Sequence, residues 1–155
     1  MTGLARGFTL IEILIVVVII SILAGILLPK AVSFRTRARA ASAVGSMSVV
    51  RNAAYNYNEG ASKWPANTSR GVVPTGLAVY LPSGFKFKQQ DFDLLWKLQT
   101  VKTGGKTTTK QMVLVYPVTT TLCAMIGSQL RGSKNPDLVI ACTGSAPTVT
   151  LYVDK

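Results

Sequence analysis

The first thirty residues constrain this chain most, because they join a short polar leader to one long apolar run. The leader, residues 1–7, has one arginine. From Phe8 to Leu28 the only polar residues are Thr9, Glu12 and Ser21. A helix of about twenty apolar residues matches a bilayer core of about 30 Å. We therefore expect residues 8–28 to form a membrane-spanning helix.

Two simpler explanations of this run are a cleaved secretory signal and a plain membrane anchor. A secretory signal has an apolar segment of about 7 to 15 residues followed by a small-x-small site, and this run is longer and lacks such a site. A plain anchor gives no reason for Glu12. An acidic residue at a membrane helix centre costs about 2.5 to 3.5 kcal/mol, so an intramembrane carboxylate usually has a partner.

A cut after Gly7 would supply that partner, because Phe8 would then carry a charged amine close to the level of Glu12. In a helical stack of identical subunits, the amine of one chain can meet the carboxylate of its neighbour. The amino-terminal segment resembles that of the type IV pilin and pseudopilin family. The resemblance rests on Gly7, on Phe8-Thr9-Leu10-Ile11-Glu12, and on Pro29 at the end of the apolar run.

The resemblance implies the processing and assembly of the chain. A prepilin peptidase would cut between Gly7 and Phe8 and N-methylate Phe8, and an inner-membrane assembly platform would extract the subunit. Glu12, Phe8 and Pro29 would be the assembly residues of a homo-oligomeric helical filament. The chain would lie in the inner membrane as a single-pass protein and then in a periplasmic or cell-surface filament, with roles in adhesion and motility.

Beyond Pro29 the pattern changes to that of a soluble amphipathic helix. Apolar residues recur at three- and four-residue steps, which predicts one buried face made of Phe34, Ala38, Ala41, Val44, Met47, Val50, Ala54 and Tyr57. Gly60 is a plausible stop, so one helix is expected from about Phe8 to Glu59. Pro29 would break a hydrogen bond to the carbonyl of Gly25, so a kink or loosened stretch is expected there.

The strongest sheet signal is a hairpin around Gly104-Gly105. Residues 94–101 and 111–116 flank this turn with β-branched, aromatic and other apolar residues. If Thr103 pairs with Lys106, Trp96 lies opposite Val113 and Leu94 opposite Val115, which gives one apolar face. Further strands are expected at residues 85–88, 138–143 and 148–153, and a short helix at residues 120–130.

Residues 61–81 are rich in Pro, Gly, Asn and Ser, so they are expected to form a loop with at most one helical turn. Trp64 and Tyr80 are expected to anchor that loop to the core. Asn67-Thr68-Ser69 matches a glycosylation sequon, a weak signal in a protein of bacterial type.

Cys123 and Cys142 are the only cysteines, with eighteen residues between them. Many type IV pilins carry a disulfide near the carboxyl terminus, and the resemblance places both cysteines outside the cytoplasm, where a disulfide is the default. Two buried free thiols are the alternative. By the same resemblance, residues 131–135 would lie in an exposed loop.

The sequence gives little support for an enzyme. It has no histidine, no metal-ligand spacing of cysteines and no glycine-rich phosphate loop, so no catalytic residue, cofactor or metal is expected. Asp91 and Asp93 could suggest calcium, but too few further oxygen ligands are identifiable, and a solvated turn is the better interpretation.

Positive charge is the remaining functional signal. The chain has 17 Lys and Arg against 6 Asp and Glu, and from Gly60 onward the balance is +7. A filament repeats its subunit, so weak contacts with DNA or an acidic polysaccharide could add up through multivalency. The candidate polyanion-binding residues are Lys97, Lys102, Lys106, Lys110, Arg131 and Lys134. Solvation and protection of a sheet edge are the alternative explanation for them.

These expectations combine into an α+β fold of the type IV pilin kind, a long amino-terminal helix against a carboxyl-terminal antiparallel sheet. The expected parts are a cleaved leader (1–7), a membrane or filament-core helix (8–28), an amphipathic helix (29–59), a variable loop region (60–93) and a sheet with a disulfide loop (94–155). The predicted function is that of a structural pilus subunit. The alternatives are a pseudopilin of a type II secretion system and a minor pilin whose basic head binds DNA or another polyanion.

Overall fold

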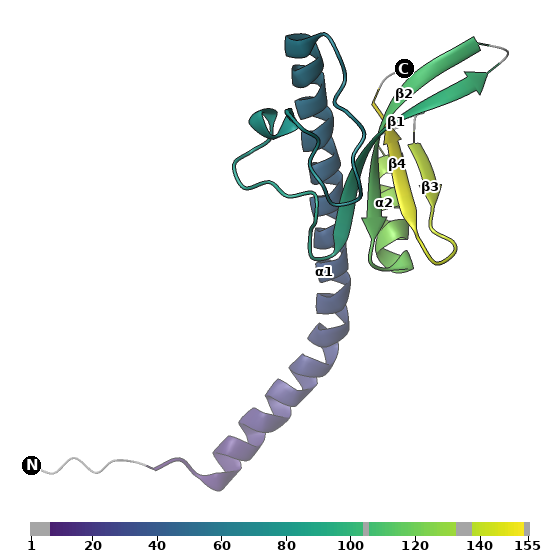
Figure 1. The fold of residues 1–155 in the computed structure, drawn as a ribbon. Coiled ribbons are helices and arrows are strands. Elements are labelled where there is room, and N and C mark those ends of the chain that lie inside the picture. Colours follow the sequence, from purple (N-terminus) through teal and green to yellow (C-terminus); the bar gives the residue numbers. More distant parts are fainter. Residues whose placement is uncertain (1–6, 104–105, 133–137, 154–155) are drawn as a thin grey trace, which may run out of the picture. The chain divides into compact units, whose positions relative to one another are not determined.

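The computed structural model describes residues 7–103, 106–132 and 138–153, without the side chains of residues 27–31, 101–103 and 106–107. The chain divides into two compact units, Met1–Arg35 and Thr36–Lys155, and each is described by itself. Helix α1 (Leu10–Ala61) runs through both, followed by η1 (Leu77–Tyr80), β1 (Phe92–Thr103), β2 (Lys106–Pro117), α2 (Thr120–Arg131), β3 (Leu138–Ala141) and β4 (Thr148–Tyr152). The fold is α+β, as predicted (Figure 1).

The four strands form one antiparallel sheet in the order β1-β2-β4-β3. The predicted register of the hairpin is confirmed, because Thr103 pairs with Lys106, and Trp96 with Val113. The expected strands near residues 138–143 and 148–153 are β3 and β4, and the expected helix near residues 120–130 is α2. Alternation in β1 and β2 therefore predicted both the register and the buried face.

The core of the second unit lies between the helices and one face of the sheet. Its fully buried side chains include Met47 and Val50 of α1, Trp96 of β1 and Ile126 of α2. Helix α2 lies against strands β2, β3 and β4 of the sheet (Figure 1). A helix with one apolar face and a sheet with one apolar face are thereby each covered by the other.

The predicted buried face of α1 is wrong in its first part. Phe34, Ala38 and Ala41 are exposed, whereas Ala40 and Ala43 are fully buried. Alanines occupy both sides of the helix between residues 38 and 43, so the three- and four-residue spacing fits either face. From Met47 onward the prediction is confirmed, because larger side chains there mark a single side.

The predicted strand at residues 85–88 is also wrong. This segment is irregular, with a single isolated bridge between Lys88 and Asp93. Phe87 is fully buried, and its carbonyl accepts a hydrogen bond from the Leu94 backbone N–H at 2.8 Å. The alternation of aromatic residues and lysines imitates a strand, but Phe87 and the half-buried Phe85 anchor a loop.

That loop region protects the edge strand β1, which has a neighbour on only one side. The Gly71 backbone N–H donates to the Leu94 carbonyl at 2.8 Å, and the Asn67 side chain bonds both the N–H and the carbonyl of Leu98. The Trp96 indole N–H donates to the Pro65 carbonyl at 3.0 Å. The exposed backbone of an edge strand can pair with a strand of another chain. Here the loop forms hydrogen bonds with part of that backbone and is held against β1 by them.

Candidate functional site

The amino-terminal motif forms the start of α1. Gly7, Phe8 and Thr9 precede the helix, and Phe8 is 78% exposed. The Thr9 hydroxyl oxygen accepts a hydrogen bond from the Glu12 backbone N–H at 3.3 Å, and the Thr9 carbonyl accepts from the N–H groups of Glu12 and Ile13. Thr9 therefore acts as the N-cap, and Thr9-Leu10-Ile11-Glu12 has the spacing of a capping box.

Glu12 consequently has a local role that the sequence-based reasoning missed. It is the acidic residue in the first turn of α1, where a negative charge favours the positive end of the helix dipole. Its side chain is exposed. The Thr-x-x-Glu spacing was visible in the sequence and could have revealed this role. A carboxylate so placed is both tolerated by its own helix and available to another molecule.

The apolar side chains that follow Glu12 remain uncovered in the single chain. Every large apolar side chain from Phe8 to Ile26 is between 50% and 84% exposed. Among the described residues, from which the side chains of 27–31 are missing, no helix is long and apolar enough to cross a membrane. Helix α1 is continuous from Leu10 to Ala61. Pro29 is among the residues whose side chains are not described, so the kink expected there stays a prediction.

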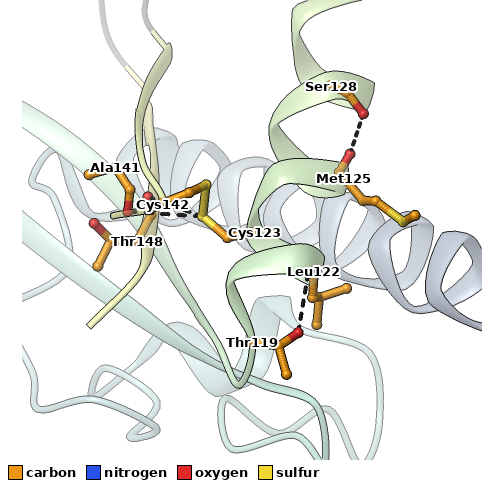
Figure 2. The surroundings of a disulfide bond; sticks show 8 residues. All are labelled: Thr119, Leu122, Cys123, Met125, Ser128, Ala141, Cys142 and Thr148. Carbon is orange, nitrogen blue, oxygen red and sulfur yellow. Dashed lines mark hydrogen bonds between the residues drawn. A yellow bond between two sulfur atoms is a disulfide. The ribbon is translucent and has the colours of Figure 1, made fainter. Parts of the chain in front are cut away.

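The two cysteines form a disulfide that joins α2 to the segment after β3 (Figure 2). Their Cα atoms are 5.6 Å apart. The Cys123 sulfur is fully buried and lies 3.9 Å from the carbonyl oxygens of Ala141 and Thr148. The helix that carries Cys123 is capped by Thr119, whose hydroxyl oxygen accepts from the Leu122 N–H at 3.2 Å. Arg131, at the other end of α2, is exposed.

The hairpin has four lysines, and the structure describes the side chains of two of them, Lys97 and Lys110. Lys97 is exposed, and the ammonium group of Lys110 lies 5.1 Å from the centroid of the Tyr152 ring. Lys102 and Lys106 lie in the strands on either side of the turn, but their side chains are outside the described residues. Lys134 also lies outside the described residues.

The acidic residues Asp91 and Asp93 each face an arginine. The guanidinium of Arg39 lies 3.3 Å from the Asp91 carboxylate, and that of Arg70 donates to Asp93 at 2.8 Å. Arg70 also lies over the Tyr116 ring at 4.7 Å. Within the described part of the chain, no group of three His, Cys, Asp or Glu is placed to hold a metal ion.

Comparison with known proteins addresses the amino-terminal segment directly. Residues 4–28 match the family model of the prokaryotic N-terminal methylation motif. The chain is 40% identical over 74 residues to the type IV major pilin protein PilE1 of Neisseria gonorrhoeae, and 43% identical over 75 residues to the type IV major fimbrial protein FimA of Dichelobacter nodosus. These matches show that part of the chain is similar to type IV major pilins.

The similarity to these type IV pilins covers only part of each protein. The match to PilE1 spans 47% of this chain and 45% of that relative, and the match to FimA spans 47% of each. The chain thus matches less than half the length of these curated relatives. No solved structure matches this chain. The hairpin, its cations and the disulfide are therefore interpreted from their own geometry.

Proposed function

We propose that this chain is the structural subunit of a type IV pilus-like filament, assembled through the first half of α1. The observation that carries the proposal is the apolar segment of residues 8–26, whose large side chains are exposed along its length and which has one carboxylate in the first turn of α1. The family motif at residues 4–28 and the names of the relatives support it.

Burial of these apolar side chains would stabilise the subunit first in the membrane and then in the assembled filament. Each large apolar side chain contributes about 1.5 to 3 kcal/mol when it is fully removed from water, so the exposed run cannot remain solvated. A bilayer would cover it before assembly, and the same segment of neighbouring subunits would cover it afterwards. Residues 1–7 would be the leader, residues 8–28 the filament core, and the second unit the part at the filament surface.

Glu12 would set the register of the assembling subunits. After a cut between Gly7 and Phe8, the new amine of Phe8 is a positive charge in an apolar bundle, and Glu12 is the acidic side chain nearest to it in sequence. Burying either charge alone is costly, whereas burying both as a pair offsets much of that cost. A neighbouring helix at the wrong height would leave both charges unpaired.

Mass spectrometry and electron microscopy of material sheared from the cell surface test this proposal. An abundant chain in filaments that begins at Phe8 and carries one added methyl group would support a major pilin. A processed chain that is absent from filaments would contradict that role and favour a pseudopilin or a minor pilin instead.

Replacement of Gly7 by valine tests the processing step separately. The bulkier residue should block the cut, so the full-length chain with its leader should accumulate in the membrane, as measured by intact mass. A mature chain of normal mass from this variant would contradict the assigned cleavage position. Gly25→Val, within the apolar run, is a matched control that should be processed normally.

A further inference from the structure

The part of α1 that follows the apolar run carries an aromatic side chain outside the core. Phe34 is 62% exposed and does not belong to the buried cluster, although its spacing in the sequence predicts burial. It lies at the end of the first unit, next to Arg35. Phe34 therefore continues the exposed apolar side chains of residues 8–26 toward the second unit.

Positive charge gathers in the same part of the helix. Residues 13–58 contain no Asp or Glu, and their basic residues are Lys30, Arg35, Arg37, Arg39 and Arg51. The Arg35 side chain is exposed and has no hydrogen bond or ion pair with any described residue. Arg39 differs, because its guanidinium lies 3.3 Å from the Asp91 carboxylate. Arg35 is thus a free cation in a segment without acidic residues, and such a segment attracts anions.

The distance from the end of the apolar run matches the depth of lipid headgroups. The seven residues from Leu28 to Arg35 rise about 10 Å along the continuous helix α1. Side chains of a helix tilt toward its amino terminus, so the long Arg35 side chain can reach back toward Leu28. The headgroup layer on each side of a bilayer is about 5 to 8 Å thick. With Leu28 at the edge of the hydrocarbon core, the Arg35 guanidinium would lie among lipid phosphates.

A second copy of this chain offers few partners for Arg35. The acidic residues of the whole chain are Glu12, Glu59, Asp91, Asp93, Asp137 and Asp154. Asp91 and Asp93 are paired with Arg39 and Arg70, and the proposed function assigns Glu12 to the amine of Phe8. The three acidic residues that remain are outnumbered by the other basic residues of the chain. An anionic bilayer, in contrast, offers a phosphate group to every stored subunit.

We propose that Arg35 binds the phosphate groups of anionic phospholipids while the subunit is stored in the membrane. The planar guanidinium matches the geometry of phosphate and can donate two hydrogen bonds to it. The adjacent Phe34 ring would lie at the same interface and lose contact with water. This inference rests on the proposed function, because a bilayer must first cover residues 8–28.

The test uses the full chain, reconstituted at low protein density into phosphatidylcholine vesicles. The probe is spin-labelled phosphatidylglycerol or spin-labelled phosphatidylcholine. Electron paramagnetic resonance measures the fraction of each probe held at the protein, and the ratio of the two association constants gives the preference for anionic lipid. Arg35→Gln should lower this preference about two- to fivefold, because one arginine beside an anionic surface contributes up to about fivefold. Arg35→Lys keeps the charge and should retain most of the preference.

The matched control is Lys63→Gln, which removes one positive charge from an exposed residue beyond the end of α1. It should keep the wild-type preference. Salt at about 1 M should bring the wild type and Arg35→Gln to the same low value, because the charges are then screened within a few ångströms. Equal losses in Lys63→Gln and Arg35→Gln would overturn the proposal, since the preference would then follow net charge alone.

Flotation of the vesicles on a density gradient separates this test from that of the proposed function. A chain that does not float with the vesicles would overturn the membrane stage of the proposed function and the lipid contact with it. A chain that floats but shows no preference for phosphatidylglycerol would overturn the lipid contact alone. Arg35→Gln with an unchanged lipid preference and a reduced filament yield would assign Arg35 to a contact between subunits instead.

Discussion

At the scale of the residue, Trp96 is the side chain that links the loop to the sheet. It is fully buried, its indole N–H donates to the Pro65 carbonyl at 3.0 Å, and its ring stacks on Trp64 with centroids 6.1 Å apart. Pro65 is itself buried. The apolar packing of the core and the attachment of the loop therefore depend on the same residue.

Trp96→Phe should destabilise the fold by about 2 to 4 kcal/mol. The substitution leaves the buried Pro65 carbonyl without its donor, which costs about 1 to 3 kcal/mol, and it also leaves a small cavity. Chemical denaturation of the purified chain measures the change. Phe92→Leu, a substitution on the same strand that affects no hydrogen-bonding side chain, is the comparison, and a smaller loss for Trp96→Phe than for it would contradict the assigned role.

Gly127 lies where α2 contacts β3 closely. A Cβ atom at this position would lie 2.7 Å from Ile140 Cδ1 and 3.2 Å from its Cγ2. Alanine gains about 1 kcal/mol over glycine within a helix, whereas overpacking costs about 1 to 3 kcal/mol. Because Ile140 would have to move more than its terminal methyl, we expect Gly127→Ala to be destabilising by about 1 kcal/mol.

Ile140→Val tests this explanation, since it removes the Cδ1 atom. In the Ile140→Val background, Gly127→Ala should be neutral or stabilising, and the thermal unfolding of the four proteins forms a double-mutant cycle. Equal effects of Gly127→Ala in both backgrounds would show that contact with Ile140 is not the cause.

At the scale of the element, the disulfide holds together two short elements that pair weakly by themselves. Strand β3 has four residues and, among the described residues, pairs only with β4, at the sheet edge opposite β1. The Cys123–Cys142 bond, 19 residues apart in sequence, ties the end of this strand to α2. The arrangement anchors an edge strand without adding further strands.

Replacement of both cysteines by serine should cost about 3 kcal/mol, because the reduced unfolded chain gains the freedom of an open loop of this size. Chemical unfolding under oxidising conditions measures the loss. Adding a reductant should lower the stability of the wild type to that of the variant and leave the variant unchanged. A variant as stable as the oxidised wild type would contradict this expectation.

At the scale of the whole molecule, the two units differ in how their apolar side chains are buried. The residues of the first unit from Phe8 to Ile26 expose their large apolar side chains, while the second unit encloses its own core. In the proposed function, a membrane or other subunits would bury the first unit, whereas the second unit already buries its own apolar residues.

Glu12→Gln should permit cleavage after Gly7 but reduce filament yield strongly. Glutamine keeps the spacing of the capping box that starts α1, so only the negative charge is lost. Filament mass sheared from cells, normalised to processed subunit, measures the effect. Ser21→Ala is the control, because the Ser21 hydroxyl donates within its own helix to the Val17 carbonyl at 2.7 Å. A normal filament yield from Glu12→Gln would show that the charge is dispensable.

The sequence by itself determined the elements whose side chains repeat with a clear period. The hairpin register followed from alternation in β1 and β2, and the resemblance to type IV pilins followed from the residues around Gly7 and Glu12. The buried face of α1 was predictable from Met47 onward, where large side chains lie on one side only. Local patterns suffice where each residue type has one favourable environment.

Only the tertiary structure decided the features that depend on distant segments. It assigned Ala40 and Ala43, rather than Ala38 and Ala41, to the core, because alanine fits either side of a helix. It joined Asn67 to Leu98 and Arg39 to Asp91, contacts that no local period encodes. It also showed that β4 pairs with β2 only from Met112 to Val115, so the β1–β2 hairpin is longer than the strand beside it. The length of that pairing depends on the distant segment that forms β4.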